Sequence, residues 1–159
     1  ATTLSDRSVD FITAGQAFHW FDRKKARAEF QRILRPNGWV ILVWNDRDSS
    51  ASEFSAAYEQ LVRRYAIDYH EVTHRQITDE IFANFYGPTG YRLATFRNPQ
   101  PLDFDGVRGR LLSSSYTPQE DHPNHAPMLA ALQEMYRTHQ RGDRIVMEYC
   151  TEMYFGQLV

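Results

Sequence analysis

Two apolar runs decide the fold of this chain: Val9-Asp10-Phe11-Ile12-Thr13-Ala14, followed by Gly15, and Trp39-Val40-Ile41-Leu42-Val43-Trp44. The first run lies between polar residues and a glycine, which is typical of a short strand. The second run has no polar interruption, as expected of a strand covered on both faces of a sheet. Between them, residues 22–34 have the spacing of an amphipathic helix that Asp22 can cap. Strand, helix and buried strand together predict a β-α-β unit and an α/β fold.

Further elements are predicted downstream of this unit. A capping box of Ser50 and Glu53 predicts a helix with the apolar face Phe54, Tyr58, Leu61, Val62 and Tyr65. We also expect a short helix over residues 78–85, a strand over 91–97, a helix that Asp105 can cap and that runs to residue 115, and a long closing strand over 144–155. Another helix is expected over 126–139, with its apolar face formed by Met128, Leu129, Leu132, Met135 and Tyr136. No repeat or linker divides the 159 residues, so the sequence predicts a single domain.

Composition excludes several classes of function. The 18 basic and 20 acidic residues give a net charge of −2, without the basic excess of nucleic-acid-binding proteins. No segment approaches the ~20 apolar residues that span a bilayer, so we expect no membrane partner. Cys150 is the only cysteine, which favours a reducing, cytoplasmic location. His70 and His74 have the spacing of paired metal ligands, but no third ligand is placed nearby, so we expect no metal site.

Two longer stretches carry a family resemblance. They are Ser8-Val9-Asp10-Phe11-Ile12-Thr13-Ala14-Gly15-Gln16-Ala17-Phe18-His19-Trp20-Phe21 and Leu34-Arg35-Pro36-Asn37-Gly38-Trp39. Both resemble the fourth and fifth motifs of class I S-adenosylmethionine-dependent methyltransferases. The wording Phe18-His19-Trp20-Phe21 and Val43-Trp44-Asn45 is similar to the methyltransferase type 11 branch, which includes trans-aconitate methyltransferase-like proteins.

The resemblance implies the C-terminal half of a Rossmann-like class I methyltransferase sheet. The four main strands would lie in the order 4-5-7-6, with the last strand antiparallel and placed between the second and the third. The family's Gly-rich cofactor turn and its ribose-binding acidic residue precede these motifs, and no Gly-x-Gly pattern occurs in the 159 residues. We therefore expect a partial domain that lacks the N-terminal cofactor motif, and a chain that is inactive by itself.

The resemblance also implies where the cofactor S-adenosyl-L-methionine binds, beyond the carboxyl end of the first strand. The residues carried over are Thr2, Thr3 and Leu4 near adenine, and Ala14, Gly15, Gln16 and Phe18 near the sulfonium. The π face of Trp20 or Phe18 could favour the sulfonium cation. His19 is the candidate catalytic residue. The alternatives are a structural His19 and aromatic side chains that only fill the core.

Candidate acceptor-binding residues lie in two places, at the end of the second strand and in a later helix and loop. Trp44, Asn45 and Arg47 come at a carboxyl end, where acceptors bind by the family's geometry. Arg110 and Tyr116 belong to a helix and loop that could cover the site. The planar guanidinium of Arg110 can hold a carboxylate with two hydrogen bonds. The alternative for Arg110 is a solvated surface charge.

The leading functional hypothesis is methyl transfer to an oxygen of a small organic acceptor. A carboxylate acceptor is already ionised, so His19 would only position it, whereas a hydroxyl acceptor would need His19 as a base. The rival hypothesis is a non-catalytic binding or assembly module that completes its sheet on another chain. In either case the strand over residues 9–14 lacks a neighbour. This predicts self-association through its edge, or burial of that edge by a rearranged segment. Half of a nicotinamide-dependent dehydrogenase ranks last, because its Gly-rich fingerprint is absent.

Overall fold

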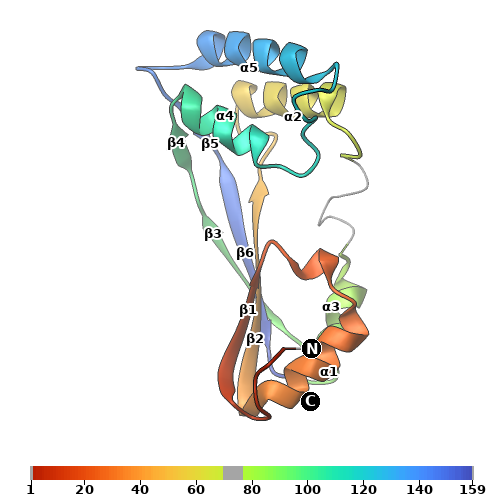
Figure 1. The fold of residues 1–159 in the computed structure, drawn as a ribbon. Helices are drawn as coiled ribbons and strands as arrows, with labels where there is room; N and C mark the ends of the chain where they lie inside the picture. The colour runs from red at the N-terminus through yellow and green to blue at the C-terminus, as the bar shows by residue number, and fades with distance from the viewer. Residues whose placement is uncertain (1, 70–76, 159) are drawn as a thin grey trace. The chain divides into compact units, whose positions relative to one another are not determined.

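The structure is a computed structural model that describes residues 2–69 and 77–158 (Figure 1). Its elements, in chain order, are β1 (Val9–Gly15), the 3-10 helix η1 (Phe18–Trp20), α1 (Arg23–Ile33), β2 (Leu34–Arg47), α2 (Glu53–Tyr65), α3 (Asp79–Tyr86), β3 (Arg92–Arg97), β4 (Gln100–Leu102), α4 (Phe104–Leu112), α5 (His125–His139), β5 (Ile145–Met147) and β6 (Tyr149–Gly156). The predicted α/β class is confirmed.

The described residues form two compact units. The first unit consists of residues 2–46, 77–96 and 151–158, and the second of residues 47–69 and 97–150. Both units therefore combine segments that are far apart in the sequence. The expectation of a single domain stays a prediction, because two compact units can belong to one domain or to two.

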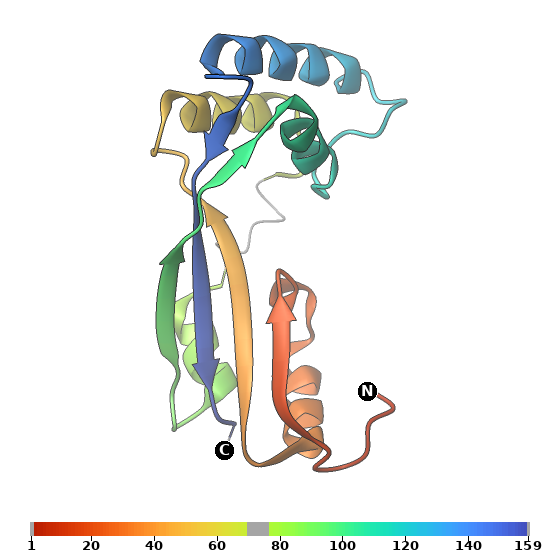
Figure 2. The same cartoon turned by 90° about the vertical axis from the view of Figure 1, so that its left-hand side faces the viewer.

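The first unit is built on a four-stranded sheet in the order β1-β2-β6-β3. Strands β1 and β2 are parallel, with Phe11 opposite Trp39 and Ala14 opposite Leu42. Strand β6 points in the opposite direction to its neighbours β2 and β3 (Figure 2). This is the predicted order, with the last strand antiparallel in the third position. Helices α1 and α3 lie on the same face of the sheet (Figures 1 and 2).

The start of β2, directly after α1, contains a bulge. Val9 pairs with Leu34 but Phe11 pairs with Trp39, so residues 35–38 of β2 have no one-to-one partners in β1. A Cβ atom on Gly38 would lie 3.0 Å from the carbonyl oxygen of Asp10 and 2.7 Å from a methyl group of Leu34. A larger residue would therefore have to displace the Leu34 side chain and crowd the backbone of Asp10, so this position favours glycine.

The core of the first unit lies between the sheet and its two helices. It consists of Ala14, Phe18, Leu34, Val40, Leu42, Trp44, Phe82, Phe85 and Tyr86. Val40, Leu42 and Trp44 of β2 face this core, as the two-residue period of a strand requires. The hydroxyl of Tyr86 donates to the carbonyl oxygen of Tyr154, 2.9 Å away, so that this buried polar group is satisfied. This hydrogen bond therefore attaches α3 to β6.

The second unit packs α2 against α5 and α4 against α5. Strands β4 and β5 form a separate two-stranded antiparallel sheet, with Gln100 opposite Met147. Its core consists of Phe54, Tyr58, Leu61, Val62, Val107, Leu111, Met128, Leu132, Tyr136, Ile145, Met147 and Tyr149. The predicted apolar faces of α2 and α5 are thereby confirmed.

One strand prediction is wrong. Residues 144–155 do not form a single strand, because β5 ends at Met147 and β6 begins at Tyr149. The break at Glu148 lets the two pieces pair in different sheets, β5 with β4 and β6 with β2 and β3.

Two of the three predicted helix caps are also wrong. Asp22 caps α1 as expected, since its side chain accepts from the backbone N–H of Lys25. Helix α2 is capped by Ser52 instead of Ser50, and α4 by Asp103 instead of Asp105. In both cases a second residue with capping chemistry lies two positions away, and tertiary packing selects between them.

No helix within residues 2–69 and 77–158 is long and apolar enough to cross a membrane. In the same part of the chain, no group of three or more His, Cys, Asp and Glu side chains could hold a metal ion. The predicted pair His70 and His74 lies outside the described residues.

Candidate functional site

The loop that follows β1 is attached to the end of β2. The backbone N–H of Gln16 donates to the carbonyl oxygen of Val43 at 2.9 Å, and Gln16 Nε2 donates to the carbonyl oxygen of Asn45 at 3.4 Å. Gln16 has a φ of 53°, a left-handed conformation that turns the chain away from the strand. A Cβ atom on Gly15 would meet nothing within 4 Å. The backbone of the loop is therefore open at the carboxyl ends of two parallel strands, where ligands bind in α/β sheets.

The aromatic residues of this loop have different environments. Phe18 is fully buried, with its ring 4.6 Å from that of Phe85 and 6.3 Å from that of Trp44. The side chain of Trp20 is 65% exposed, and its ring lies 4.8 Å from that of the half-buried His19. Trp20 and His19 are thus the side chains of the loop that a ligand could reach, whereas the ring of Phe18 fills the core. A role for any of them in binding stays a prediction.

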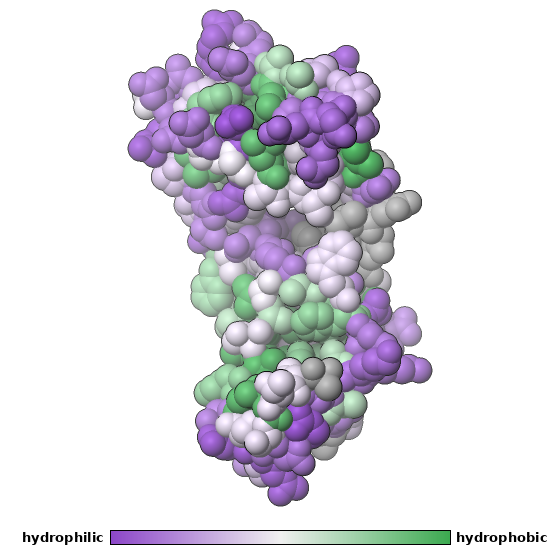
Figure 3. All heavy atoms as spheres, in the orientation of Figure 1, coloured by the Kyte–Doolittle hydropathy of each residue, from purple (hydrophilic) through white to green (hydrophobic). Residues whose placement is uncertain are grey.

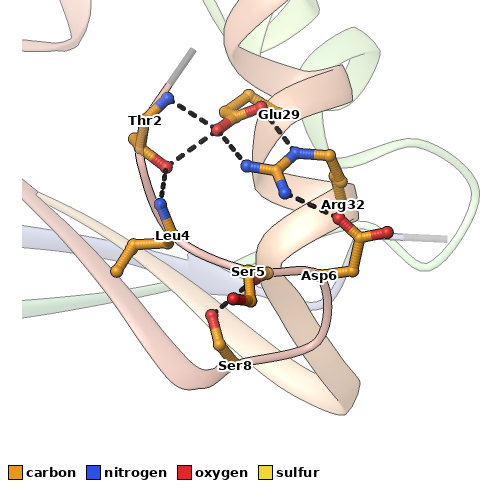
Figure 4. A network of polar contacts seen from close by, with 7 residues as sticks. All are labelled: Thr2, Leu4, Ser5, Asp6, Ser8, Glu29 and Arg32. Carbon is orange, nitrogen blue, oxygen red and sulfur yellow. Dashed lines mark hydrogen bonds and ion pairs between the residues drawn. The ribbon is translucent and has the colours of Figure 1, made fainter.

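The segment before β1 is attached to helix α1 by a polar network (Figure 4). The backbone N–H and the hydroxyl of Thr2 both donate to Glu29 Oε1, at 2.7 and 2.8 Å. Arg32 also binds Glu29 and reaches Asp6 at 2.6 Å. The Arg32 guanidinium, followed by the bonds from Thr2, lowers the pKa of Glu29 below its ordinary value.

All three residues predicted near adenine, Thr2, Thr3 and Leu4, are exposed. Of these, Thr2 holds the segment on α1 through its bonds to Glu29. Leu4 leaves 45% of its side chain open to solvent. An apolar side chain is therefore accessible beside the fixed backbone of this segment.

The residues at the end of β2 divide between core and surface. Trp44 is 2% exposed and packs edge-on against Phe82 and Tyr154. Its indole is a core residue, and its predicted contact with an acceptor stays a prediction. The side-chain oxygen of Asn45 accepts a hydrogen bond from the hydroxyl of Thr151 at 2.6 Å.

In the second unit, three of the predicted acceptor residues and four other residues form what we call the tyrosine–arginine cluster, with Arg47 at its centre. Its members are Arg47, Tyr58, Glu59, Tyr69, Arg110, Tyr116 and Tyr149. The guanidinium of Arg47 donates to Glu59 Oε2 at 2.5 Å and lies 4.6 Å above the ring of Tyr58. The Tyr69 hydroxyl donates to the same Glu59 oxygen at 2.9 Å. Both charged side chains are largely buried, with 14% and 10% of their surfaces exposed.

The remaining members of the cluster lie around Arg110 and Tyr116. Arg110 donates to the side-chain oxygen of Gln100, a neutral amide, and its guanidinium lies 5.3 Å from the ring centre of Tyr149. The ring of Tyr116 packs edge-on against that of Tyr69 at 4.9 Å. Arg110 is half-buried, so the alternative of a fully solvated surface charge does not describe it.

Burial and hydrogen bonds shift the pKa values of Tyr58, Tyr149, Glu59 and Arg47 in this cluster. Burial raises the pKa of Tyr58 and of Tyr149. Burial acts to raise the pKa of Glu59, but hydrogen bonds from Tyr69 and Arg47 outweigh it and lower the value. Burial likewise acts to lower the pKa of Arg47, but the oxygens of Tyr116, Tyr58 and Tyr69 and the bond to Glu59 outweigh it and raise the value. At neutral pH the cluster therefore offers hydroxyl and guanidinium donors.

The structure thus brings together Arg47, Arg110 and Tyr116, which the sequence marked as acceptor-binding candidates. Sequence reasoning missed Tyr58, Glu59, Tyr69 and Tyr149 as members of this cluster. Tyr58 was recognised only as part of the apolar face of α2, and Tyr149 only as part of the closing strand. No local pattern of the sequence marks these four residues as neighbours, because Tyr69 and Tyr149 lie outside α2, which holds Tyr58 and Glu59.

Comparison with known proteins supports the family resemblance. Residues 1–42 match the family model described as a methyltransferase domain. An uncharacterised methyltransferase of Schizosaccharomyces pombe is 50% identical over 50 residues, which are 31% of this chain and 20% of that protein. An uncharacterised methyltransferase of Mycobacterium bovis is 51% identical over 45 residues, 28% of this chain and 18% of that protein. These matches span about a fifth of the length of the curated relatives.

Solved structures show the same fold over almost the whole chain. A protein of Anaeromyxobacter dehalogenans described as a type II methyltransferase superposes with a TM-score of 0.63 at 22% identity, over 97% of this chain and 66% of that one. A protein of Anabaena variabilis described as a methyltransferase from an antibiotic biosynthesis pathway gives 0.55 at 17% identity, over 96% and 69%. The predicted resemblance to S-adenosylmethionine-dependent methyltransferases is confirmed.

Proposed function

We propose that this chain is part of a class I S-adenosyl-L-methionine-dependent methyltransferase that methylates an oxygen atom of a small organic acceptor. One observation carries the proposal. The segment that matches the methyltransferase family includes the open loop after β1, and this loop is attached to the end of the parallel strand β2. Crevices at the carboxyl ends of such strands bind ligands. We further propose that the protein acts in the cytoplasm.

In this proposal one wall of the cofactor site comes from the first unit. The backbone of Ala14, Gly15 and Gln16 would approach the methionine part, because no side chain blocks Gly15. The exposed ring of Trp20 would face the sulfonium, which an aromatic face favours by about 0.5–2 kcal/mol. Leu4 would supply an apolar contact for adenine. When bound, the cofactor supplies a methyl group on a positively charged sulfur.

The role of the chain's own residues depends on the acceptor. Transfer to an oxygen requires mainly that the acceptor be held in line with the methyl group. A carboxylate needs no proton removed, so the role of His19 would be limited to positioning. Arg110 and Tyr116 are proposed separately as carboxylate-binding residues of the second unit. A hydroxyl would need His19 to take its proton. The tyrosine–arginine cluster favours the carboxylate, because its guanidinium groups and neutral hydroxyls are hydrogen-bond donors.

We propose that residues 1–159 alone bind the cofactor weakly and are inactive. The Gly-rich turn that supplies backbone donors in such enzymes has no counterpart among these residues. Losing several hydrogen bonds of about 0.5–1.5 kcal/mol each moves a micromolar site towards the millimolar range. The contacts from Gly15 to Trp20 are too few to replace them.

Isothermal titration with S-adenosyl-L-methionine tests this proposal. We expect millimolar or weaker binding by residues 1–159, and micromolar binding by a chain that its own gene extends through a Gly-rich turn. In the longer chain, Trp20→Ala should weaken binding by about tenfold. Phe96→Ala is the matched control, because Phe96 is 54% exposed in the same unit and plays no part in the proposal. Micromolar binding by residues 1–159 would contradict it.

A second candidate function is a non-catalytic assembly module. The observation that favours it is the position of β1 at the end of the strand order, where one edge has no partner among the described strands. Such an edge readily pairs with another chain. We propose that residues 1–159 self-associate through β1. Cofactor titration of the longer chain separates the two functions, because an assembly module would not bind S-adenosyl-L-methionine.

A further inference from the structure

The two arginines of the tyrosine–arginine cluster differ in how their charge is compensated. Arg47 is paired with the carboxylate of Glu59. Glu59 also binds Arg63 through its other oxygen at 2.9 Å, but Arg63 is 53% exposed, so water and salt screen its charge. Arg110 is bonded to the neutral Gln100 and, within the described part of the chain, makes no ion pair. Among the described residues, the cluster therefore holds one positive charge without a carboxylate partner, on the half-buried Arg110.

One buried hydrogen-bond donor of the cluster has no acceptor among the described residues. It is Arg47 Nε, which makes no hydrogen bond within this part of the chain. The Tyr58 side chain, 1% exposed, covers the same guanidinium with its ring 4.6 Å away. Buried donors are almost always satisfied in native proteins, because an unsatisfied one costs free energy. Hydrogen-bond donors near the guanidinium of Arg110, which has no carboxylate partner among the described residues, are suited to bind an anion.

We propose that the tyrosine–arginine cluster selects a ligand with one carboxylate group, and that Glu59 and Gln100 set this selectivity. Arg110 is the cation that binds the carboxylate. Glu59 is a specificity-determining residue, because it neutralises Arg47 and repels a second carboxylate. Gln100 is a neutral partner, so it does not neutralise the positive charge of Arg110 that would bind the ligand. The inference rests on the proposed acceptor site and narrows the acceptor to a monocarboxylate.

Charge balance is the reason for the selectivity. A single carboxylate brings the buried charge of the cluster from one positive to zero. A second one would be an unpaired charge in a partly buried place and would meet the negative Glu59 side chain, and both effects oppose binding. A dicarboxylate is therefore expected to bind more weakly than a monocarboxylate of the same length.

Titration with hexanoate and adipate tests this inference, because the two acids have the same number of carbon atoms and differ by one carboxylate. Binding is followed by NMR shifts of the ¹⁵N-labelled 159-residue chain without cofactor. We expect hexanoate to bind with shifts of the Arg110 and Tyr116 signals, and adipate to bind more weakly. Equal or tighter binding of adipate, or no binding of hexanoate, would overturn the inference.

Two substitutions change the charge balance in opposite directions. Gln100→Glu gives Arg110 a carboxylate partner in the existing contact, so hexanoate binding should fall by about tenfold or more. Glu59→Gln removes the compensation of Arg47, so adipate should gain affinity relative to hexanoate by about tenfold. Arg108→Gln on the same helix is the control and should change neither, since Arg108 is exposed. Unchanged binding in Q100E overturns the inference, and so does an equal effect of E59Q on both acids.

If E59Q fails to fold, Q100E and the comparison of the two acids on the wild-type chain still test the inference, because neither removes a partner of Arg47.

The outcome of these titrations is independent of the proposed methyl transfer. Hexanoate binding requires no cofactor, so it can fail while S-adenosyl-L-methionine still binds the longer chain. If hexanoate binds but S-adenosyl-L-methionine does not bind the longer chain, the protein has a carboxylate site and the proposed methyl transfer is wrong.

Discussion

Phe18 and Trp20 lie two residues apart in η1 and have opposite environments. The Phe18 ring has no exposed surface and contacts aromatic rings of β2 and α3, whereas 65% of Trp20 is exposed. The backbone of the short helix therefore divides the aromatic loop into an inner and an outer side. Core packing depends on the first residue, and ligand contact in the proposed function depends on the second.

Substitution of these two residues separates the roles. Phe18→Ala should lower the free energy of unfolding by about 3–5 kcal/mol, because it leaves a cavity in a closely packed aromatic core. Trp20→Ala should change it by only about 0.5 kcal/mol, as is usual for exposed side chains. Urea unfolding followed by circular dichroism measures both. Equal losses in the two variants would show that the ring of Trp20 is part of the core.

At the same scale, sequence patterns identified some residues of the candidate site and missed others. Arg110 was a candidate because a guanidinium holds carboxylates, and Arg47 because it follows a strand that ends at the proposed site. Glu59 gave no such signal, since a helix pattern shows which side faces the core but not which buried cation a carboxylate meets there. Its partner Tyr69 comes after the helix, where no period constrains the chain. Contacts between separate elements remain hidden from local patterns.

At the scale of elements, the helices show how far local signals reach. The period of apolar residues located α1, α2 and α5 because each buries one face. The starts of α2 and α4 were misplaced by two residues, since Ser50 and Asp105 have the same capping chemistry as Ser52 and Asp103. Strand β4 was missed, because three residues that include Pro101 carry almost no strand signal.

The cap of α4 provides a test with a built-in control. Asp103 accepts a hydrogen bond from the backbone N–H of Gly106 at 2.8 Å. Asp103→Ala should therefore lower the free energy of unfolding by about 1 kcal/mol, the usual value of a helix cap. Asp105→Ala, in the first turn of the same helix, should cost only about 0.3 kcal/mol through the helix dipole. Thermal unfolding measures the loss of stability in the two variants. A larger loss in Asp105→Ala than in Asp103→Ala would show that Asp105 caps the helix.

At the scale of the whole molecule, the sheet of the first unit exposes apolar side chains. Phe11 on β1 is 62% exposed and Phe96 on β3 is 54% exposed, at the two ends of the strand order. Hydrophobic residues reach the surface over the strands of this unit, beside the hydrophilic residues of α1 (Figure 3). An open strand edge with apolar neighbours favours association between chains.

The proposed self-association predicts which edge is used. Phe11→Lys places a charge beside the β1 edge and should shift the chain towards monomer, with little change in stability because the side chain is exposed. Phe96→Lys makes the same change at the other edge and should leave the association unchanged. Light scattering coupled to size-exclusion chromatography, over a range of concentrations, measures the mass. A wild-type chain that stays monomeric would refute the proposal, and an effect of F96K alone would move the contact to β3.

The position of β6 affects how the protein can be made by the ribosome. Strands β1, β2 and β3 are synthesised first, but β6, Tyr149–Gly156, lies between β2 and β3 in the sheet. The growing chain must therefore keep that place open while more than fifty residues of the second unit are translated, with apolar strands exposed to aggregation. Translation that stops before residue 149 would leave β3 without its neighbour, so a late stop codon is expected to harm the first unit as much as the second.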